Sequence, residues 1–118
     1  MKKLLLMFSC MLVFAGGCAN APDKQLLGTW LQPIPTDPTQ TRGFEFQKHG
    51  RVVSINPSTV NYNTWRISDN NILVLSGSDR STGSPILTKD YYTITKLNNS
   101  MLVLTRFDGQ VEYYSHTK

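Results

Sequence analysis

The sequence contains only 2 Cys, and both lie near its start, at Cys10 and Cys18. No cysteine follows them, so a folded domain in the rest of the chain has no disulfide bond and no thiol for catalysis or metal binding. Such a domain must be held together by its hydrophobic core.

Histidine and glutamate are as scarce as cysteine. His49 and His116 are the 2 His, and Glu45 and Glu112 are the only glutamates. Neither His has a second His or a carboxylate beside it at the spacing of metal ligands, which favours two surface residues over a metal site. The two glutamates are expected to point outward, and no serine stands in a Gly-x-Ser-x-Gly elbow. These scarcities predict a protein that is not an enzyme and holds neither a metal nor a cofactor.

Charge is low and evenly spread along the chain. The formal net charge is +4, but Lys2 and Lys3 supply half of it, and the other basic residues are scattered singly. A nucleic-acid-binding protein clusters Lys and Arg on one surface, so no nucleic-acid partner is expected. A hydrophobic content of 40% is too high for a disordered chain, and 118 residues allow one domain.

One long hydrophobic run is present, from Leu4 to Phe14. A membrane-spanning helix needs about 20 apolar residues, so this run is too short to be one. Two lysines precede the run and small residues follow it, which is the pattern of a secretory signal peptide. Residues 1–17 are therefore interpreted as a signal peptide.

Residues 15–18, with the sequence Ala-Gly-Gly-Cys, resemble the lipobox of bacterial lipoproteins. The resemblance implies that Cys18 receives a diacylglycerol, that the chain is cut before it, and that the new amino group is acylated. The match departs from the family at Ala15, where leucine is commonest. An ordinary signal peptide cut near Ala19 or Ala21 is the alternative.

Lipidation would tie the protein to a membrane of the cell envelope. More than one acyl chain gives stable anchoring, and residues 18–25 would then form the lipidated cysteine and a tether. By resemblance to the sorting of lipoproteins in bacteria with two membranes, Ala19 after the cysteine implies the outer membrane.

Residues 26–118 predict an all-β domain. Short runs of β-branched and aromatic residues alternate with turn residues, and no long stretch has the 3.6-residue apolar period of a helix. Eight strands are expected, at Gly28–Gln32, Arg42–Gln47, Arg51–Ile55, Thr59–Ser68, Ile72–Gly77, Leu87–Thr95, Met101–Arg106 and Gln110–His116.

The turns between these strands indicate how the strands pair. Asp108-Gly109 between the last two predicts a two-residue type I′ hairpin. Successive short strands with tight turns are typical of an up-and-down antiparallel sheet. An open sheet of this size would expose two edges and an apolar face, so closure into a small eight-stranded barrel is expected.

The first expected strand begins with the motif Leu27-Gly28-Thr29-Trp30. With seven further strands behind it, this Gly-x-Trp motif resembles the start of lipocalin or calycin proteins, and more closely the small lipocalin-like lipoproteins of Bacteroidota. The resemblance covers residues 26–106 and implies a lipocalin-like barrel. It also implies that Trp30 plugs one end of the barrel and that Arg106 packs across the indole. The long helix that follows the barrel in lipocalins has no counterpart in this sequence.

An eight-stranded barrel is just wide enough to be packed solid or to hold one small ligand. Alternation places Phe44, Phe46, Trp65 and Tyr92 on the inner face, where they either line a ligand pocket or fill the core. The proline-rich segment 33–38 is either a lid over the barrel mouth or a rigid connector.

Two functions of different class fit these features. The first is reversible binding of a small hydrophobic or amphipathic molecule at the barrel mouth by a lipoprotein of the cell envelope. The alternative is a protein-interaction module with a solid core, which presents its rim to an envelope partner.

Overall fold

The computed structural model describes residues 22–69 and 71–117. The segment 1–17, interpreted as a signal peptide, and Cys18, the expected site of lipidation, lie outside the described residues. No helix within the described part is long and apolar enough to cross a membrane.

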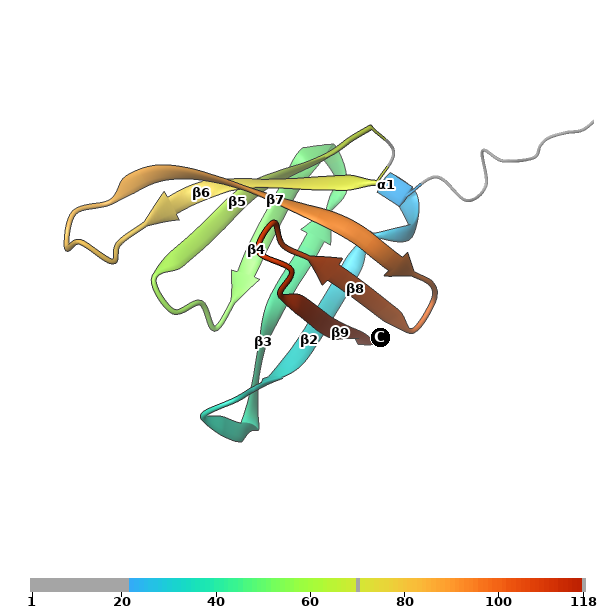
Figure 1. The fold of residues 1–118 in the computed structure, drawn as a ribbon, viewed down its shortest axis with the longest axis horizontal. Coiled ribbons are helices and arrows are strands. Elements are labelled where there is room, and N and C mark those ends of the chain that lie inside the picture. The colour runs from blue at the N-terminus through green and yellow to red at the C-terminus, as the bar shows by residue number, and fades with distance from the viewer. Residues whose placement is uncertain (1–21, 70, 118) are drawn as a thin grey trace, which may run out of the picture.

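The described residues form a short helix and eight strands (Figure 1). The elements are α1 (Pro22–Gln25), β2 (Gly28–Ile34), β3 (Asp37–Gln47), the 3-10 turn η3 (Lys48–Gly50), β4 (Arg51–Ile55), β5 (Val60–Ser68), β6 (Ile72–Asp79), β7 (Ile86–Leu97), β8 (Met101–Thr105) and β9 (Val111–Thr117). Each strand pairs antiparallel with the next, and β9 pairs with β2, so the sheet closes on itself. The predicted eight-stranded up-and-down antiparallel barrel is thereby confirmed.

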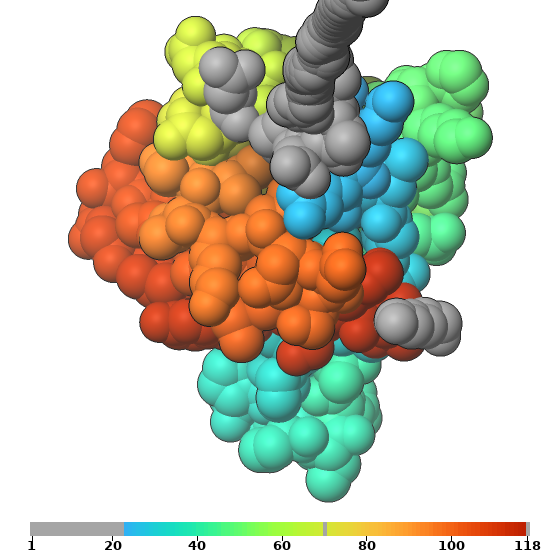
Figure 2. All heavy atoms as spheres, turned by 90° about the vertical axis from the view of Figure 1, so that its right-hand side faces the viewer, coloured from blue at the N-terminus to red at the C-terminus, as the bar shows by residue number. Residues whose placement is uncertain are grey.

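The up-and-down order gives the barrel two different ends. α1, η3 and the β5–β6 and β7–β8 turns gather at one end, which we call the closed end. The connections β2–β3, β4–β5, β6–β7 and β8–β9 lie at the other, which we call the mouth. Figure 2 looks onto the closed end, with α1 near the centre of the view.

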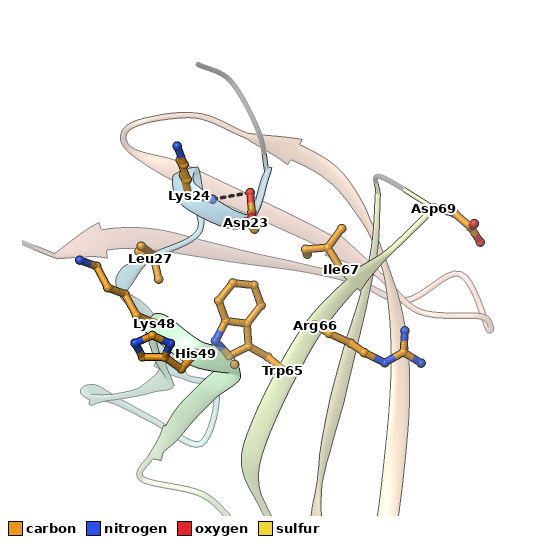
Figure 3. A pocket seen from close by; sticks show the side chains of 10 residues that line it. Asp23, Lys24, Leu27, Lys48, His49, Trp65, Arg66, Ile67 and Asp69 are labelled. Atoms are coloured by element: carbon orange, nitrogen blue, oxygen red, sulfur yellow. Dashed lines mark hydrogen bonds between the residues drawn. The ribbon is translucent and has the colours of Figure 1, made fainter. Parts of the chain in front are cut away.

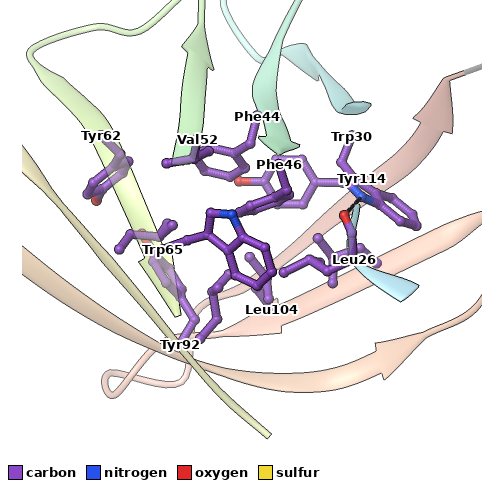
Figure 4. Close-up of a cluster of buried hydrophobic side chains, with 13 residues drawn as sticks. Leu26, Trp30, Phe44, Phe46, Val52, Tyr62, Trp65, Tyr92, Leu104 and Tyr114 are labelled. Carbon is purple, nitrogen blue, oxygen red and sulfur yellow. Dashed lines mark hydrogen bonds between the residues drawn. The ribbon is translucent and has the colours of Figure 1, made fainter. Parts of the chain in front are cut away.

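The core consists of inward side chains from all eight strands, joined by Leu26 next to α1 (Figure 4). The predicted alternation is confirmed in β3, β6 and β8, where Phe44 and Phe46, Leu73 and Leu75, and Leu102 and Leu104 are all buried. The buried cluster is Leu26, Trp30, Phe44, Phe46, Val52, Tyr62, Trp65, Leu73, Leu75, Tyr92, Leu102, Leu104 and Tyr114.

Val74 is buried although it lies outside this cluster, on the outer face of β6. The register places it between Arg66 of β5 and Tyr91 of β7. The ring of Tyr91 in turn stacks on Phe107, with centroids 6.4 Å apart. The outer face is therefore less polar than alternation alone predicts.

The proline-rich segment 33–38 is a hairpin and not a lid. Pro33 and Ile34 end β2, Asp37 and Pro38 begin β3, and Ile34 pairs with Asp37 after a bulge. The tip of this hairpin projects from the body of the barrel in both Figure 1 and Figure 2.

The β8–β9 turn also differs from its prediction. The backbone N–H of Gly109 donates to the carbonyl of Arg106 at 3.0 Å, and Arg106 N–H donates to the carbonyl of Gln110 at 2.9 Å. Gly109 has a φ of 87°, whereas Asp108 does not have the positive φ that a type I′ turn requires. The loop is therefore a type I turn followed by a left-handed glycine.

Candidate functional site

Trp30 fills the closed end of the barrel. Its side chain is fully buried, and its Nε1–H donates to the carbonyl of Leu26 at 2.8 Å. The indole stacks on the imidazole of His116, with ring centroids 4.5 Å apart and planes at 28°. The residue that covers Trp30 is thus His116, which is half-buried and not the free surface residue expected from the sequence.

Arg106, the expected partner of Trp30, lies at the mouth. It is exposed, and its Cζ lies 5.9 Å from the centroid of the Tyr92 ring. The reason is strand direction: β2 and β8 run the same way, so the start of β2 and the residue after β8 lie at opposite ends of the barrel. The predicted Trp30–Arg106 contact is therefore wrong.

Charged side chains surround the inner wall at the mouth. Asp90 precedes Tyr92 on the inward face of β7, and Arg42 precedes Phe44 on that of β3. Glu112 shares the inward face of β9 with Tyr114, which corrects its predicted outward position. With Arg106, two guanidinium groups and two carboxylates line the mouth.

Three tyrosines link these charges to the core. The Tyr62 hydroxyl donates to Oδ2 of Asp90, and the Tyr114 hydroxyl donates to Oε1 of Glu112 at 3.2 Å. Burial raises the pKa of Tyr62 and of Tyr114, and the carboxylate beside each raises it further. Burial also raises the pKa of Tyr92. All three phenols therefore stay protonated at neutral pH and keep their O–H groups as donors.

A small pocket opens at the mouth, where β3, β4, the β4–β5 turn and β5 line it together with Tyr114 of β9. Its volume is about 120 Å³. The aromatic rings of Phe44, Tyr62 and Tyr114 form its apolar wall, and Arg42 lies on its rim. The Arg42 guanidinium is held by Gln32, whose Oε1 accepts a hydrogen bond from Nε at 2.7 Å. A second depression of about 180 Å³ lies on the other side of the mouth, beside Asp90, Tyr92 and Arg106.

The four aromatic residues predicted to bind a ligand do not share one pocket. Phe44 and Tyr92 lie at the two mouth depressions, and Phe46 is packed deep in the core. Trp65 lies toward the closed end, where its Nε1–H donates to the carbonyl of Gln47 at 3.0 Å and its ring borders an outer cleft (Figure 3). All four are buried, with exposures of 2–9%.

Asp90 and Arg42 were not among the predicted site residues, although the sequence carried a signal for both. Asp90 alternates with Tyr92, and Arg42 alternates with Phe44, so both follow from the face already assigned to the aromatics. Glu112 could not be placed in this way, because Tyr113 and Tyr114 are adjacent and equally suited to the core. Among residues 22–69 and 71–117, no three His, Asp or Glu side chains are grouped to hold a metal ion.

The comparisons with known proteins agree with this geometry. A solved crystal structure, that of a lipocalin-like protein from Bacteroides thetaiotaomicron VPI-5482, superposes with a TM-score of 0.69 at 28% sequence identity. The match covers 79% of this chain and 97% of that chain. A search of curated proteins finds no match. The family described as lipocalin-like matches residues 22–117, and this chain belongs to that family.

Proposed function

We propose that this protein is a non-catalytic lipoprotein of the cell envelope that binds a small amphipathic molecule at the mouth of its barrel. The observation that supports binding is the mouth pocket, where the aromatic wall of Phe44, Tyr62 and Tyr114 stands beside the Arg42 guanidinium. An apolar ring or short chain would pack against the aromatic wall. A polar or anionic group on the same molecule would pair with Arg42 at the rim.

The dimensions of the mouth limit the ligand. Pockets for drug-sized molecules measure about 300–1,000 Å³, whereas the two mouth depressions measure about 120 and 180 Å³. A long acyl chain needs more room than either offers. The four charged side chains around the inner wall also disfavour a purely apolar ligand, because burying them beneath it would cost their hydration.

Binding can be tested with three probes of equal ring size and different charge: benzoate, benzylamine and toluene. Each is titrated into the isotopically labelled protein, and backbone amide shifts are followed by nuclear magnetic resonance. We expect benzoate to shift residues near Phe44, Tyr62 and Tyr114, and to bind more tightly than the other two probes. Shifts that cluster elsewhere, or equal binding of all three, would contradict the proposed site.

Two matched variants sharpen this test. Arg42→Gln removes the rim cation and should weaken benzoate binding about tenfold, the typical effect of losing one charge-assisted hydrogen bond. Arg66→Gln removes an exposed cation of β5 at the opposite end of the barrel and should leave benzoate binding unchanged. Thermal melting of both variants checks that the fold is intact.

Anchoring through Cys18, and with it the outer-membrane location, is supported by the sequence motif and by the family of envelope lipoproteins that the motif resembles. The test is Cys18→Ser. We expect the wild-type chain to partition into detergent with the mass of a triacylated cysteine, and the variant to remain uncleaved or to become soluble. Unchanged detergent partitioning of processed Cys18→Ser protein would refute lipidation at this residue.

A protein-interaction module is the second candidate, and the outer face of β7–β9 favours it. Phe107 is 93% exposed and Tyr113 is 62% exposed, with Tyr91 and Val111 beside them on the same three strands and their turn. Native mass spectrometry after gentle purification separates the two functions. A retained small molecule supports binding at the mouth, whereas a mouth that binds no probe together with a stoichiometric protein partner supports the module.

A further inference from the structure

The closed end carries a cleft that the proposed ligand site does not use (Figure 3). Its volume is about 820 Å³, and Leu27, Trp65 and Ile67 form its apolar part. Exposed charged side chains surround it: Lys24 and Lys48 lie on one side of the Trp65 indole and Arg66 on the other, and the carboxylates of Asp23 and Asp69 lie at its edge. Basic groups around a partly apolar surface match the chemistry of a phospholipid headgroup and its glycerol backbone.

Charge differs between the two ends of the barrel. Each charged residue of the described part is assigned to the nearer end of its strand, and Arg42, near the middle of β3, is assigned to the mouth because it lines the mouth pocket. By this count the mouth holds four basic and five acidic residues. The closed end holds five basic and three acidic residues: Lys24, Lys48, Arg51, Arg66 and Lys96 against Asp23, Glu45 and Asp69. One of these acids, Asp23, already accepts a hydrogen bond from the backbone N–H of Lys24 at 2.9 Å. The positive end is therefore the one from which the chain leads back to Cys18.

The length of the tether decides which end faces the bilayer. Three residues separate Cys18 from Pro22, the first residue of α1. Even fully extended, the four steps from Cys18 to Pro22 span about 14 Å, whereas a strand of seven residues is about 23 Å long. A lipid on Cys18 thus keeps the closed end near the membrane and excludes an orientation in which the mouth points at the bilayer and the closed end away from it.

We propose that the closed end is a membrane-docking surface, on which Lys24, Lys48 and Arg66 contact the phosphates of anionic lipids while the cleft beside Trp65 admits part of a headgroup. This inference rests on the anchoring through Cys18 proposed above. The mouth then points away from the bilayer, toward the aqueous side from which a ligand arrives.

The rate at which individual lysines are acetylated tests this orientation, because a lysine in contact with the membrane reacts more slowly. The lipidated protein is inserted into vesicles of phosphatidylcholine alone, or of phosphatidylcholine mixed with phosphatidylglycerol, and acetylated with an amine-reactive ester. Mass spectrometry then gives the rate at each lysine. We expect acetylation of Lys24 and Lys48 to slow several-fold on the anionic vesicles and to recover at high salt. Lys89, in the mouth half of β7, should react equally on both vesicles.

A charge-reversal pair provides the matched control. Lys48→Glu with Arg66→Glu should abolish the protection of Lys24, whereas Arg80→Glu with Lys89→Glu, the same charge change at the mouth, should preserve it. Equal rates at Lys24 on both vesicle types, or protection that survives the first pair, would overturn docking.

The mass of the mature chain separates failure of docking from failure of anchoring. A chain without acyl groups refutes the anchor, and docking is then tested by co-sedimentation of that chain with the same vesicles. Binding to the anionic vesicles that Lys48→Glu with Arg66→Glu abolishes supports the docking surface. Absence of such binding overturns it.

Discussion

At the scale of single residues, Gly28, Trp30 and His116 together determine how the closed end of the barrel is packed. Trp30, from the first strand, and His116, from the last, stack at 4.5 Å because closure of the barrel brings β9 beside β2. Gly28 has a φ of 120°, and a Cβ there would lie 2.6 Å from Nε2 of His116. The glycine of the Gly-x-Trp motif is thus required both by its backbone conformation and by the ring that covers the tryptophan.

The first prediction concerns Trp30→Ala. It removes a fully buried side chain, and the free energy of unfolding should fall by about 3–5 kcal/mol. His116→Ala removes only the stacked ring and should cost about 0.5–1.5 kcal/mol. Urea denaturation measures both, and a larger loss for His116→Ala than for Trp30→Ala would contradict the central role of the indole.

The second prediction concerns Gly28→Ala, which should destabilise the barrel by about 1–3 kcal/mol. Part of this loss comes from the contact with His116 and part from the positive φ. In a His116→Ala background the contact is gone but the strain stays, so the cost of Gly28→Ala should shrink without vanishing. A double-mutant cycle measures this difference. If Gly28→Ala lowers the free energy of unfolding equally in both backgrounds, the imidazole of His116 does not clash with a Cβ at residue 28.

At the scale of elements, the sequence predicted the strands well and their connections less well. β4 has the expected bounds, whereas β3 begins at Asp37 instead of Arg42, because β2 and β3 continue as a two-stranded hairpin beyond the barrel wall. Proline is tolerated in such a segment, where one side of the strand needs no backbone donor. Alternation is a local property and can be read from neighbours, but the length of a hairpin depends on how far two strands remain paired.

The third prediction tests the β8–β9 turn. Gly109 has a φ of 87° and open space around its Cα, so Gly109→Ala meets no obstacle and its cost comes from the backbone alone. The free energy of unfolding should fall by about 1–2 kcal/mol. Gly109→Asn should cost less, because asparagine adopts the left-handed conformation more readily. Equal losses for the two variants, measured by urea denaturation, would contradict the turn assignment.

At the scale of the whole molecule, the mouth and the closed end differ in chemistry. The mouth combines three tyrosines with nearly balanced charges, and the closed end has an excess of basic residues around a partly apolar cleft. A barrel with two such ends can face a membrane with one and a ligand with the other, which is the arrangement proposed above.

The fourth prediction concerns stability at alkaline pH. Tyr62, Tyr92 and Tyr114 have raised pKa values in the folded state, above the ordinary value of 10.0. Below pH 10 both states hold these protons, so the tyrosines cause no pH dependence there. Above it, the unfolded chain loses protons that the folded one keeps, and the free energy of unfolding therefore falls as pH rises.

Urea denaturation at several pH values between 8 and 12 measures how the free energy of unfolding falls, and the Tyr114→Phe variant is the control. Removing the most deeply buried of the three phenols should make the slope above pH 10 shallower by about 1.4 kcal/mol per pH unit. A slope that is the same in both proteins would show that Tyr114 ionises as freely in the barrel as in the unfolded chain.

Periods of two and short motifs were enough to predict the eight strands, the faces of the paired aromatics and the resemblance to the lipocalin-like family, because these features are local. The folded barrel places His116 over Trp30, turns Glu112 inward and disperses the four inner aromatics along its length, and none of these three features follows from local sequence. The physical reason is closure: ring formation sets which distant side chains meet, and the bulges in β5 and β7 shift the alternation on which local inference relies.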